Sequence, residues 1–396
     1  MAVHEEVVEI VRTLLAELGS YRAQAAVRGS AHLDRDLGLG SLERVELMLR
    51  LGAAFGTHLP DQVVAEADTV DDLVDALLAH AGTAAAGALE QLSAPAVERL
   101  PARAAALGVE SAETWQDVLR YRARADAARP HIYLREEDGR ASVITYGELY
   151  ERSSAVARGL VRRGVAPGDA VAIMLPTSRE FFYTFAGVLL AGGIPVPIYP
   201  PFRADRIAEY AARQSAILQN AEACLLVTFR QAEAVARLLT PRVRSLAGVV
   251  TASRLAEEPA ESGSSSPHRA RGQDIALLQY TSGSTGEPRG VILTHANLLA
   301  NVRAIGEAVD VRPDDRAVSW LPLYHDMGLI GAWMVPLYFG VPVAILSPLA
   351  FLSRPERWLW AVHHHRATLG AGPNFAYELC VRKIAASDIE GLDLGS

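Results

Sequence analysis

Apolar positions near the start of the chain recur at the spacing of amphipathic helices. Valine, isoleucine and leucine follow a three-to-four-residue period over 3–18 and again over 69–78, which places them on one face of each helix. Between these segments lies LGLGSLERVEL (37–47), where Ser41 stands at a helix start, followed by an apolar face and an acidic opposite face. The pattern predicts a small all-α bundle of three or four helices over residues 1–82.

The pattern changes after this bundle. Residues 83–112 are rich in alanine and other small residues with weak periodicity, which is typical of a linker. Over residues 113–396 short apolar runs alternate with helical patterns, which predicts doubly wound α/β sheets with helices on both faces and ligands at the carboxyl ends of parallel strands. The predicted strands are 170–175, 194–198, 224–229, 291–293, 317–320 and 342–346, and the main predicted helices are 180–190, 207–220, 231–239, 328–338 and 355–365.

The net charge is confined to one end of the chain. Residues 1–82 carry 14 acidic side chains against 6 arginines, which accounts for the formal net charge of −8, and the remainder carries 32 of each sign. Such a separation indicates a distinct domain and argues against nucleic acid as the main partner.

Cysteine content and hydropathy bear on the compartment. Cys224 and Cys380 are too few for a disulfide framework, and the acidic start of the chain is unlike a signal peptide. The uncharged stretch 327–352 is interrupted by glycines and prolines, so it cannot be one membrane-spanning helix. We predict a buried helix followed by a buried strand there, no membrane span, and a cytoplasmic location.

The strongest chemical signal is YTSGSTGEPRG (280–290). Glycines let backbone N–H groups approach a ligand, hydroxyls add further donors, and Arg289 adds a permanent positive charge. The Walker pattern does not fit, because no Lys-Ser or Lys-Thr pair follows the glycines. The loop is therefore predicted to hold a polyphosphate by another arrangement. Its candidate ligands are Thr281, Ser282, Gly283, Ser284, Thr285, Gly286 and Arg289.

This string is similar to the phosphate-binding signature of adenylate-forming enzymes, which join a carboxylate to AMP and hand the acyl group to a thiol. Members usually have lysine where this chain has Arg289. Further motifs look like those of the fatty acyl-AMP ligase branch, which activates long fatty acids and passes them to carrier proteins rather than to coenzyme A. These motifs are PVPIYPPFR (195–203), LPLYHDMGLIG (321–331), SPLAFLSRPERWL (347–359) and GPNFAYELCVRK (372–383).

The resemblance implies roles for particular residues. The loop residues and Arg289 would bind the β- and γ-phosphates of ATP, with ATP and Mg²⁺ as cofactors. His325 would act catalytically beside the acyl pocket and the α-phosphate, and Asp326 would orient it or cap the next helix. The residues expected to line the acyl tunnel or the adenine edge are Gly372, Pro373, Asn374 and Phe375.

A run of histidines suggests a metal site at first sight. His363, His364 and His365 are adjacent, so a helix would spread them around its axis and they could not share one ion. We expect a solvated helix face there and no metal-ligand cluster.

The acidic bundle resembles an acyl carrier domain, in which the serine that opens the second helix bears a 4′-phosphopantetheine arm attached by a phosphopantetheinyl transferase. Ser41 is the matching residue, and Glu43 and Glu46 would meet basic partners. Gly40 stands where the family has aspartate. The alternative is that Ser41 is only a helix cap.

Together the resemblances imply activation of a long-chain fatty acid with ATP to acyl-AMP and transfer to a carrier-protein phosphopantetheine thiol. The context would be lipid, polyketide or lipopeptide biosynthesis, with downstream synthase modules as partners. The family's chain continues into a region that holds a ribose-binding acid, a magnesium-binding glutamate and the adenylation lysine, so we expect this sequence to be an incomplete ligase. The alternatives are an acyl-CoA synthetase, a peptide-synthetase adenylation domain, or a non-catalytic carrier module with a ligase remnant.

Overall fold

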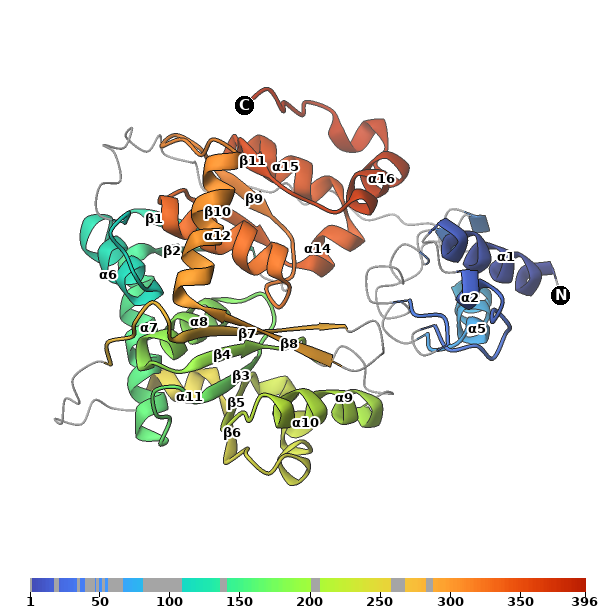
Figure 1. Cartoon of the computed structure of the whole chain (residues 1–396). Helices are drawn as coiled ribbons and strands as arrows, with labels where there is room; N and C mark the ends of the chain where they lie inside the picture. Colours follow the sequence, from blue (N-terminus) through green and yellow to red (C-terminus); the bar gives the residue numbers. More distant parts are fainter. Residues whose placement is uncertain are drawn as a thin grey trace. The chain divides into compact units, whose positions relative to one another are not determined.

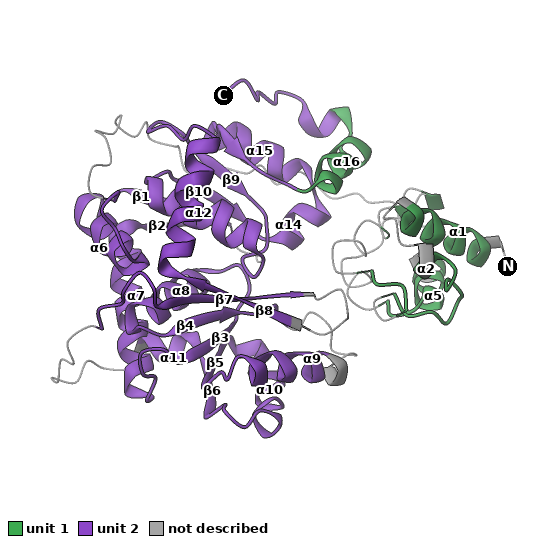
Figure 2. Cartoon of the chain, viewed as in Figure 1, with its two compact units in different colours: residues 1–93, 202–205, 373–386 green, residues 94–201, 206–372, 387–396 purple. Residues whose placement is uncertain are grey.

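The structure, a computed structural model, describes residues 2–17, 21–33, 36–39, 47, 50–51, 54–55, 67–80, 109–135, 141–200, 207–257, 268–282 and 288–396. The chain divides into two compact units, coloured separately in Figure 2. The first comprises residues 1–93, 202–205 and 373–386, and the second comprises residues 94–201, 206–372 and 387–396.

Helices α1 and α5 of the first unit each bury one apolar face, as predicted. Val11 and Leu15 from α1 pack in one core with Leu73 and Leu77 from α5. The helical N-terminal region is therefore confirmed, whereas the predicted helix start at Ser41 lies outside the described residues. The described helices of this unit are α1 (Ala2–Glu17), α2 (Tyr21–Gln24), α5 (Val70–His80) and α16 (Asn374–Lys383).

A four-stranded parallel sheet in the second unit has the order β4-β3-β5-β6. Successive side chains of a strand point to opposite faces. Accordingly Val171 packs with the α7 and α8 side, while Ala172 packs with the α9 and α10 side. Figure 1 shows these helices on the two faces, so the doubly wound prediction is confirmed. The bounds are β3 (Ala170–Met174), β4 (Ile194–Pro197), β5 (Leu225–Thr228), β6 (Gly248–Thr251), α7 (Tyr146–Arg162), α8 (Arg179–Ala191), α9 (Ile207–Asn220), η1 (Arg230–Ala232), α10 (Glu233–Arg237), η2 (Thr240–Arg242) and α11 (Ala252–Glu257).

A second sheet of the same unit is mixed rather than parallel. Its order is β11-β9-β10-β1-β2, and β1 pairs with β2 antiparallel. The sequence pattern did not predict β1, β2 and β11 of this sheet, or helix α14, which begins after Ser347. It also did not predict β6 and α11 of the first sheet. The bounds are β1 (Pro130–Arg135), β2 (Ala141–Thr145), β9 (Ala317–Ser319), β10 (Val343–Leu346), β11 (Leu369–Gly370), α6 (Trp115–Ala125), α12 (His295–Ala308), η3 (Met327–Met334), α13 (Val335–Phe339), α14 (Pro348–Ser353), α15 (Glu356–His365) and η4 (Ala386–Ile389).

The strands that flank the glycine-rich loop form a third, two-stranded sheet. β7 (Ile275–Ser282) and β8 (Pro288–Thr294) pair antiparallel, with Tyr280 opposite Gly290 and Thr281 opposite Arg289. The expectation that the strand at 291–293 continues a parallel series is therefore wrong. Strands linked by a few residues pair as a hairpin, because a parallel crossover needs a dozen residues or more.

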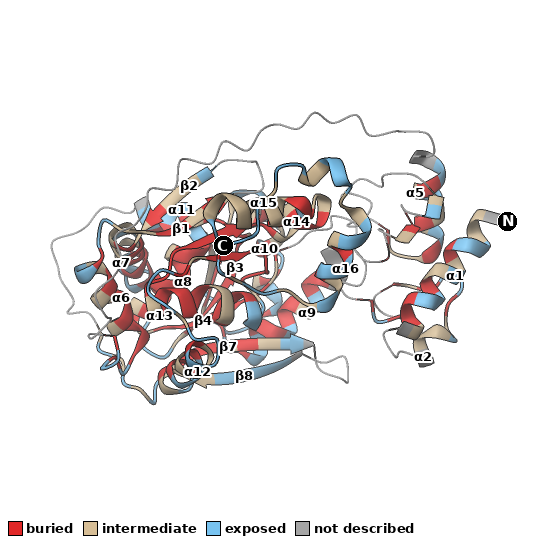
Figure 3. Cartoon of the chain, turned by 90° about the horizontal axis from the view of Figure 1, so that it is seen from above, coloured by how far each residue is buried: buried red, intermediate tan, exposed pale blue. Residues whose placement is uncertain are grey.

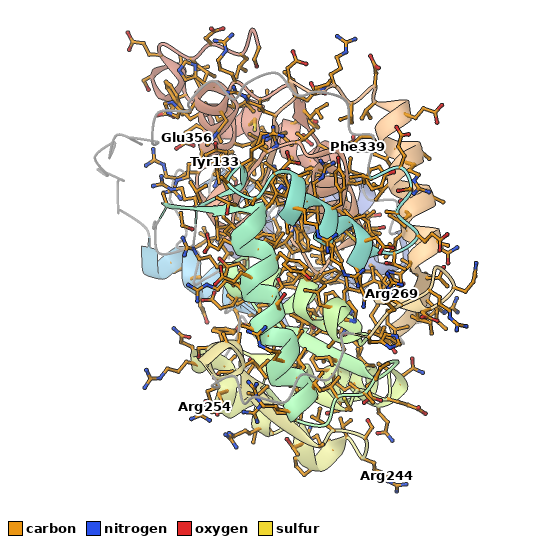
Figure 4. All side chains as sticks on the ribbon, turned by 90° about the vertical axis from the view of Figure 1, so that its left-hand side faces the viewer. Tyr133, Arg244, Arg254, Arg269, Phe339 and Glu356 are labelled. Atoms are coloured by element: carbon orange, nitrogen blue, oxygen red, sulfur yellow. The ribbon has the colours of Figure 1, made fainter. Side chains whose placement is uncertain are left out.

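The uncharged stretch is a buried helix followed by a buried strand, as predicted. It comprises η3, α13 and β10. η3 has π-helical geometry, in which the N–H of Val335 donates to the carbonyl of Ile330. None of the helices in the described ranges is long and apolar enough to cross a membrane. Outside the core the surface is rich in arginine, and Figure 4 shows Arg244 and Arg254 pointing into solvent.

One arginine is instead buried in the second unit. The Arg122 side chain is 1% exposed, and its Nη1 lies 3.0 Å from Oδ2 of Asp126. Its Nε donates to the carbonyl oxygen of Leu337 at 3.0 Å, and its Nη2 donates to that of Tyr338. A single guanidinium thus joins α6 to the last turn of α13, where backbone carbonyls need donors.

Two histidines are buried as neutral hydrogen-bond acceptors. His131 is fully buried, stacks on Tyr146 and accepts a hydrogen bond from Nε1 of Trp333 at 3.2 Å; burial lowers its pKa to about 3. His295 Nδ1 accepts from the backbone N–H of Trp115 at 3.1 Å. Burial lowers the pKa of His295 to about 4, against the opposing effect of Asp274 and Asp117.

These histidines predict acid sensitivity of the second unit. Since the unfolded chain takes up a proton near pH 6.5 and folded His295 near pH 4, stability is full above pH 6.5 and falls as the pH drops toward 4. The slope is up to about 1.4 kcal/mol per pH unit for each histidine. In His295→Asn the amide oxygen replaces Nδ1 without titrating, so denaturation monitored by tryptophan fluorescence should depend less on pH in this interval. An unchanged slope would show that other groups set the acid sensitivity.

Candidate functional site

Two residues beside the glycine-rich loop lie on the same face of the hairpin. Thr281 and Arg289 are directly opposite in the β7–β8 register, and both are exposed. Opposed side chains of an antiparallel pair are neighbours on one face, so a hydroxyl and a fixed positive charge stand together there. Gly283, Ser284, Thr285 and Gly286 lie outside the described residues, and only the backbone of Ser282 is described.

Tyr280 ties the hairpin to α9. Its hydroxyl donates to Oδ1 of Asn220 at 2.6 Å, and partial burial raises the pKa of that hydroxyl. Its ring also covers Gly290, where an added Cβ would lie 3.0 Å from the ring carbon Cζ. Gly290 therefore serves close packing of the two strands.

Gln279 ties the hairpin to the LPLYHDMG segment. Its side chain is 4% exposed, and Nε2 donates to the carbonyl oxygen of Tyr324 at 2.8 Å. Figure 3 shows β7 changing from buried to exposed along its length. The polar anchor thus lies in the buried part, just before the exposed end that carries Thr281. The sequence reading did not single out Gln279, because nothing local distinguishes it from other strand residues.

His325 is a solvent-facing side chain held by its neighbour. It is 61% exposed, and its Nδ1 lies 2.6 Å from Oδ1 of Asp326. That carboxylate also accepts the backbone N–H of Met327 at 2.7 Å, so Asp326 both holds the imidazole and caps η3. With Nδ1 engaged by the carboxylate, Nε2 is the nitrogen turned toward other groups.

The π-helix η3 directly follows this pair. Gly328 is required at its start, because an added Cβ would lie 2.2 Å from the carbonyl oxygen of Pro322. At the other end Trp333 is fixed by His131 and by edge contacts with Phe182 and Phe185. π-Helical turns often occur at functional sites, and this one joins an exposed imidazole to a rigid core.

The remaining predicted site residues fall in both units. Gly372 ends a segment of the second unit, whereas Pro373 belongs to the first unit together with Asn374 and Phe375, the opening residues of α16. Their predicted contact with an acyl chain or adenine stays a prediction.

The histidine run is less solvated than predicted. His363, His364 and His365 on α15 are all half-buried. His363 accepts from the backbone N–H of Asp393 at 2.9 Å, and His365 packs against Tyr133 with ring centroids 5.1 Å apart. Burial lowers the pKa of His365 to about 4. The expected solvated face is thus wrong, because the helix end packs on the mixed sheet and the C-terminal segment.

Comparison with known proteins matches separate parts of the chain to two families. Residues 119–396 match the family described as AMP-binding enzyme, and residues 6–77 match the one described as phosphopantetheine attachment site.

Two similar proteins and one similar solved structure are named as fatty-acid ligases. The long-chain-fatty-acid–AMP ligase FadD26 of Mycobacterium marinum is 38% identical over 271 residues, which are 66% of this chain and 45% of the relative. The medium-chain-fatty-acid–[acyl-carrier-protein] ligase JamA of Moorena producens is 33% identical over 288 residues, 71% of this chain and 47% of the relative. A solved structure of fatty acyl-adenylate ligases from E. coli and L. pneumophila superposes with a TM-score of 0.66 at 33% identity and covers 71% of this chain and 50% of that chain. The chain therefore spans about half the length of these relatives.

Proposed function

Since the chain belongs to the AMP-binding enzyme family, we propose that its protein activates a long-chain fatty acid with ATP and passes the acyl group to the thiol of a phosphopantetheine arm. A carboxylate oxygen attacks the α-phosphorus and pyrophosphate leaves; the thiol sulfur then attacks the acyl carbon and AMP leaves. One observation carries the choice of acceptor: a phosphopantetheine attachment region (6–77) and an AMP-binding region (119–396) occur in one chain. The names of FadD26 and JamA support a fatty acid as the activated carboxylate.

We assign the hairpin to the phosphates of ATP. The exposed Thr281 hydroxyl and Arg289 guanidinium share one face beside the loop, and such a set of donors fits a polyphosphate. Donors of this kind stabilise negative charge as it develops on the transferring phosphate. Mg²⁺, which binds mainly through phosphate oxygens and water, would enter with ATP. Ser282, Gly283, Ser284, Thr285 and Gly286 complete the proposed set.

His325 is proposed to act at the acyl group. Asp326 fixes the imidazole through Nδ1, which leaves Nε2 to contact the substrate carboxylate or the α-phosphate. Gly372, Pro373, Asn374 and Phe375 are proposed to contact the acyl chain or adenine. A phosphopantetheinyl transferase would load Ser41, and downstream synthases would consume the acyl carrier. Cys224 and Cys380 are too few for a disulfide framework, which suits a reducing cytoplasm.

Trapping with hydroxylamine tests activation. Incubated with ATP, Mg²⁺, hexadecanoic acid and hydroxylamine, the full-length protein that contains this chain should yield an acyl hydroxamate. A carrier that bears the arm should gain the acyl group in preference to coenzyme A. Arg289→Ala should slow hydroxamate formation about a hundredfold, because it removes a charge aimed at the phosphates. Arg244→Ala, which removes another exposed arginine, labelled in Figure 4, is the control. Preferential formation of acyl-CoA would favour an acyl-CoA synthetase, and activation of amino acids alone would favour a peptide-synthetase domain.

A further inference from the structure

Positive charge is concentrated beyond the carboxyl ends of β5 and β6 in the second unit. Residues 229–256 contain five arginines and one glutamate, a formal net charge of +4, although the chain from residue 83 onward is neutral as a whole. Arg230 comes shortly after β5, and Arg254 lies in α11, directly after β6. Because these strands are parallel neighbours, their carboxyl ends meet at one edge of the sheet and bring the two arginines together.

The arginines converge on one carboxylate, that of Glu233 in α10. Nη2 of Arg237 donates to its Oε1 at 2.6 Å, and Nη1 of Arg254 lies 3.8 Å from the same oxygen. The hydrogen bond from Arg237, together with the charges of Arg254 and Arg230, lowers the pKa of Glu233. We call Arg230, Arg237 and Arg254 the arginine patch. Its charge exceeds what the ionised Glu233 neutralises.

The arginine patch is an open surface. The side chains of Arg237 and Arg254 are 59% and 63% exposed. Figure 4 shows Arg254 on the outside of the unit, as it does Arg244, which belongs to the same charged segment. Leu238, beside Arg237, is 51% exposed. Exposed guanidinium groups bind single carboxylates weakly, so this surface suits a broad partner that offers several carboxylates at once.

The patch shares a sheet edge with the residues assigned to ATP. The sheet has the parallel order β4-β3-β5-β6, so all four carboxyl ends lie along one edge. Tyr199, just beyond β4, and Thr281, at the end of β7, line one cleft there. Three strand spacings, about 15 Å, separate β4 from β6. A macromolecule bound at the patch would therefore stand beside the proposed site of activation.

The composition of the segment favours an acidic protein as the partner. Membrane-surface helices bury a row of apolar side chains, but Leu238 is the only large hydrophobic residue exposed in 229–256, all of which the structure describes. Single-stranded nucleic acid stacks on aromatic rings, and the only aromatic residue of this segment, Phe229, is half-buried. Residues 1–82, in contrast, carry a net charge of −8 and include the match to a phosphopantetheine attachment site. A carrier domain of such composition is complementary to the patch.

We propose that the arginine patch docks an acidic acyl carrier domain for acyl transfer. Carboxylates of the carrier pair with Arg230, Arg237 and Arg254, and Leu238 adds an apolar contact. Glu233 competes for Arg237 and Arg254, which keeps docking weak and lets the loaded carrier leave. This inference rests on the proposed function, because the carrier is the acceptor proposed there.

Binding of a fluorescently labelled acidic acyl carrier protein, without its arm, tests the surface. The full-length protein that contains this chain should bind the carrier at low salt and release it as salt rises, because the screening length falls from about 30 Å at 0.01 M to about 3 Å at 1 M. Combining Arg230→Gln, Arg237→Gln and Arg254→Gln should weaken binding about a hundredfold, since each exposed pair is worth up to about fivefold. Arg152→Gln, which removes an exposed arginine of α7, should bind as the wild type does.

Glu233→Gln tests the proposal in the opposite direction. It removes the competing carboxylate, so the carrier should bind up to about fivefold more tightly. If the cluster only holds α10 in place, Glu233→Gln lowers the melting temperature and leaves carrier binding unchanged. If the triple variant does not fold, Arg230→Gln alone, which keeps the ion pairs of Glu233 with Arg237 and Arg254, should still weaken binding up to about fivefold.

Each outcome decides one point. Equal carrier binding by the wild type and the patch variants, or binding that salt does not affect, overturns the surface. Tighter patch-dependent binding of anionic phospholipid vesicles or of DNA would assign the patch to that ligand and overturn the carrier as partner. Hydroxamate formation is measured separately and should be unchanged in the patch variants. Activation without patch-dependent carrier binding refutes only this surface, and such binding without activation refutes only the proposed function.

Discussion

Replacing Ser41 with alanine is expected to abolish attachment of phosphopantetheine. The arm is joined through a phosphodiester to the serine oxygen, and alanine has no oxygen to accept it. Residues 6–77 match the phosphopantetheine attachment site, and within them the string LGLGSLERVEL places Ser41 at the start of a predicted helix. With a phosphopantetheinyl transferase and coenzyme A, the wild-type protein should gain the mass of one arm and Ser41→Ala should gain nothing.

Two further variants, Ser30→Ala and Gly40→Asp, make this result interpretable. Ser30→Ala removes another serine of the same unit and should leave the mass gain intact. If Ser41 is only a helix cap, the wild type gains no mass and Ser41→Ala only loses about 1 kcal/mol of stability. No modification of the wild type by several transferases would implicate Gly40, and Gly40→Asp would then be expected to restore it. A mass gain in Ser41→Ala would move the attachment to a different residue.

Replacing Arg122 with leucine is expected to destabilise the second unit by about 3–5 kcal/mol, the usual cost of removing one partner of a buried ion pair. The change leaves Asp126, which is 8% exposed, paired only with the partly exposed Arg129 at 3.2 Å, and removes donors from the carbonyls of Leu337 and Tyr338. All five tryptophans of the chain lie in the second unit, so denaturation followed by tryptophan fluorescence reports on it alone.

The same helix offers a matched control. Arg120 pairs with Asp117 at 3.0 Å, but the two side chains are 23% and 41% exposed, so Arg120→Leu should cost no more than about 1 kcal/mol. Arg122→Lys should recover only part of the loss, because an ammonium group lacks the planar fork that reaches a carboxylate and two carbonyls together. Equal effects of Arg120→Leu and Arg122→Leu would contradict the account of Arg122 as a buried anchor.

Sequence periodicity predicts the elements whose structure depends least on contacts with distant segments of the chain. α1, α8 and α9 have long apolar stripes, and β3 is a continuous apolar run, so their existence follows from local pattern. Strand direction is not contained in such a pattern, so the pattern places the strand at 291–293 in a parallel series, whereas β8 pairs antiparallel with β7. The short separation of the two strands was the available signal, since it excludes a parallel crossover.

The site was predictable only where it forms a motif. The glycine-rich string and LPLYHDMG can be recognised from the sequence alone. Asp326 holds His325, as expected. Gln279 could not be found this way, because a glutamine becomes distinctive only when distant segments bury it. β1 was missed for a related reason: PHIYLR opens with proline and mixes polar with apolar residues, so its strand character depends on pairing with β10 and β2.

Because η3 is a π-helix, the orientation of the His325 side chain depends on the number of residues in this helix. A π-turn holds more residues than an α-turn, so losing one residue, such as Gly331 with open space beside its Cα, would favour α-helical geometry. Trp333 is locked into the core by His131, so the rotation would appear at the other end and swing His325 with Asp326 by about 100°. Substitutions in η3 change its side-chain contacts, whereas a single deletion changes the direction in which the imidazole of His325 points.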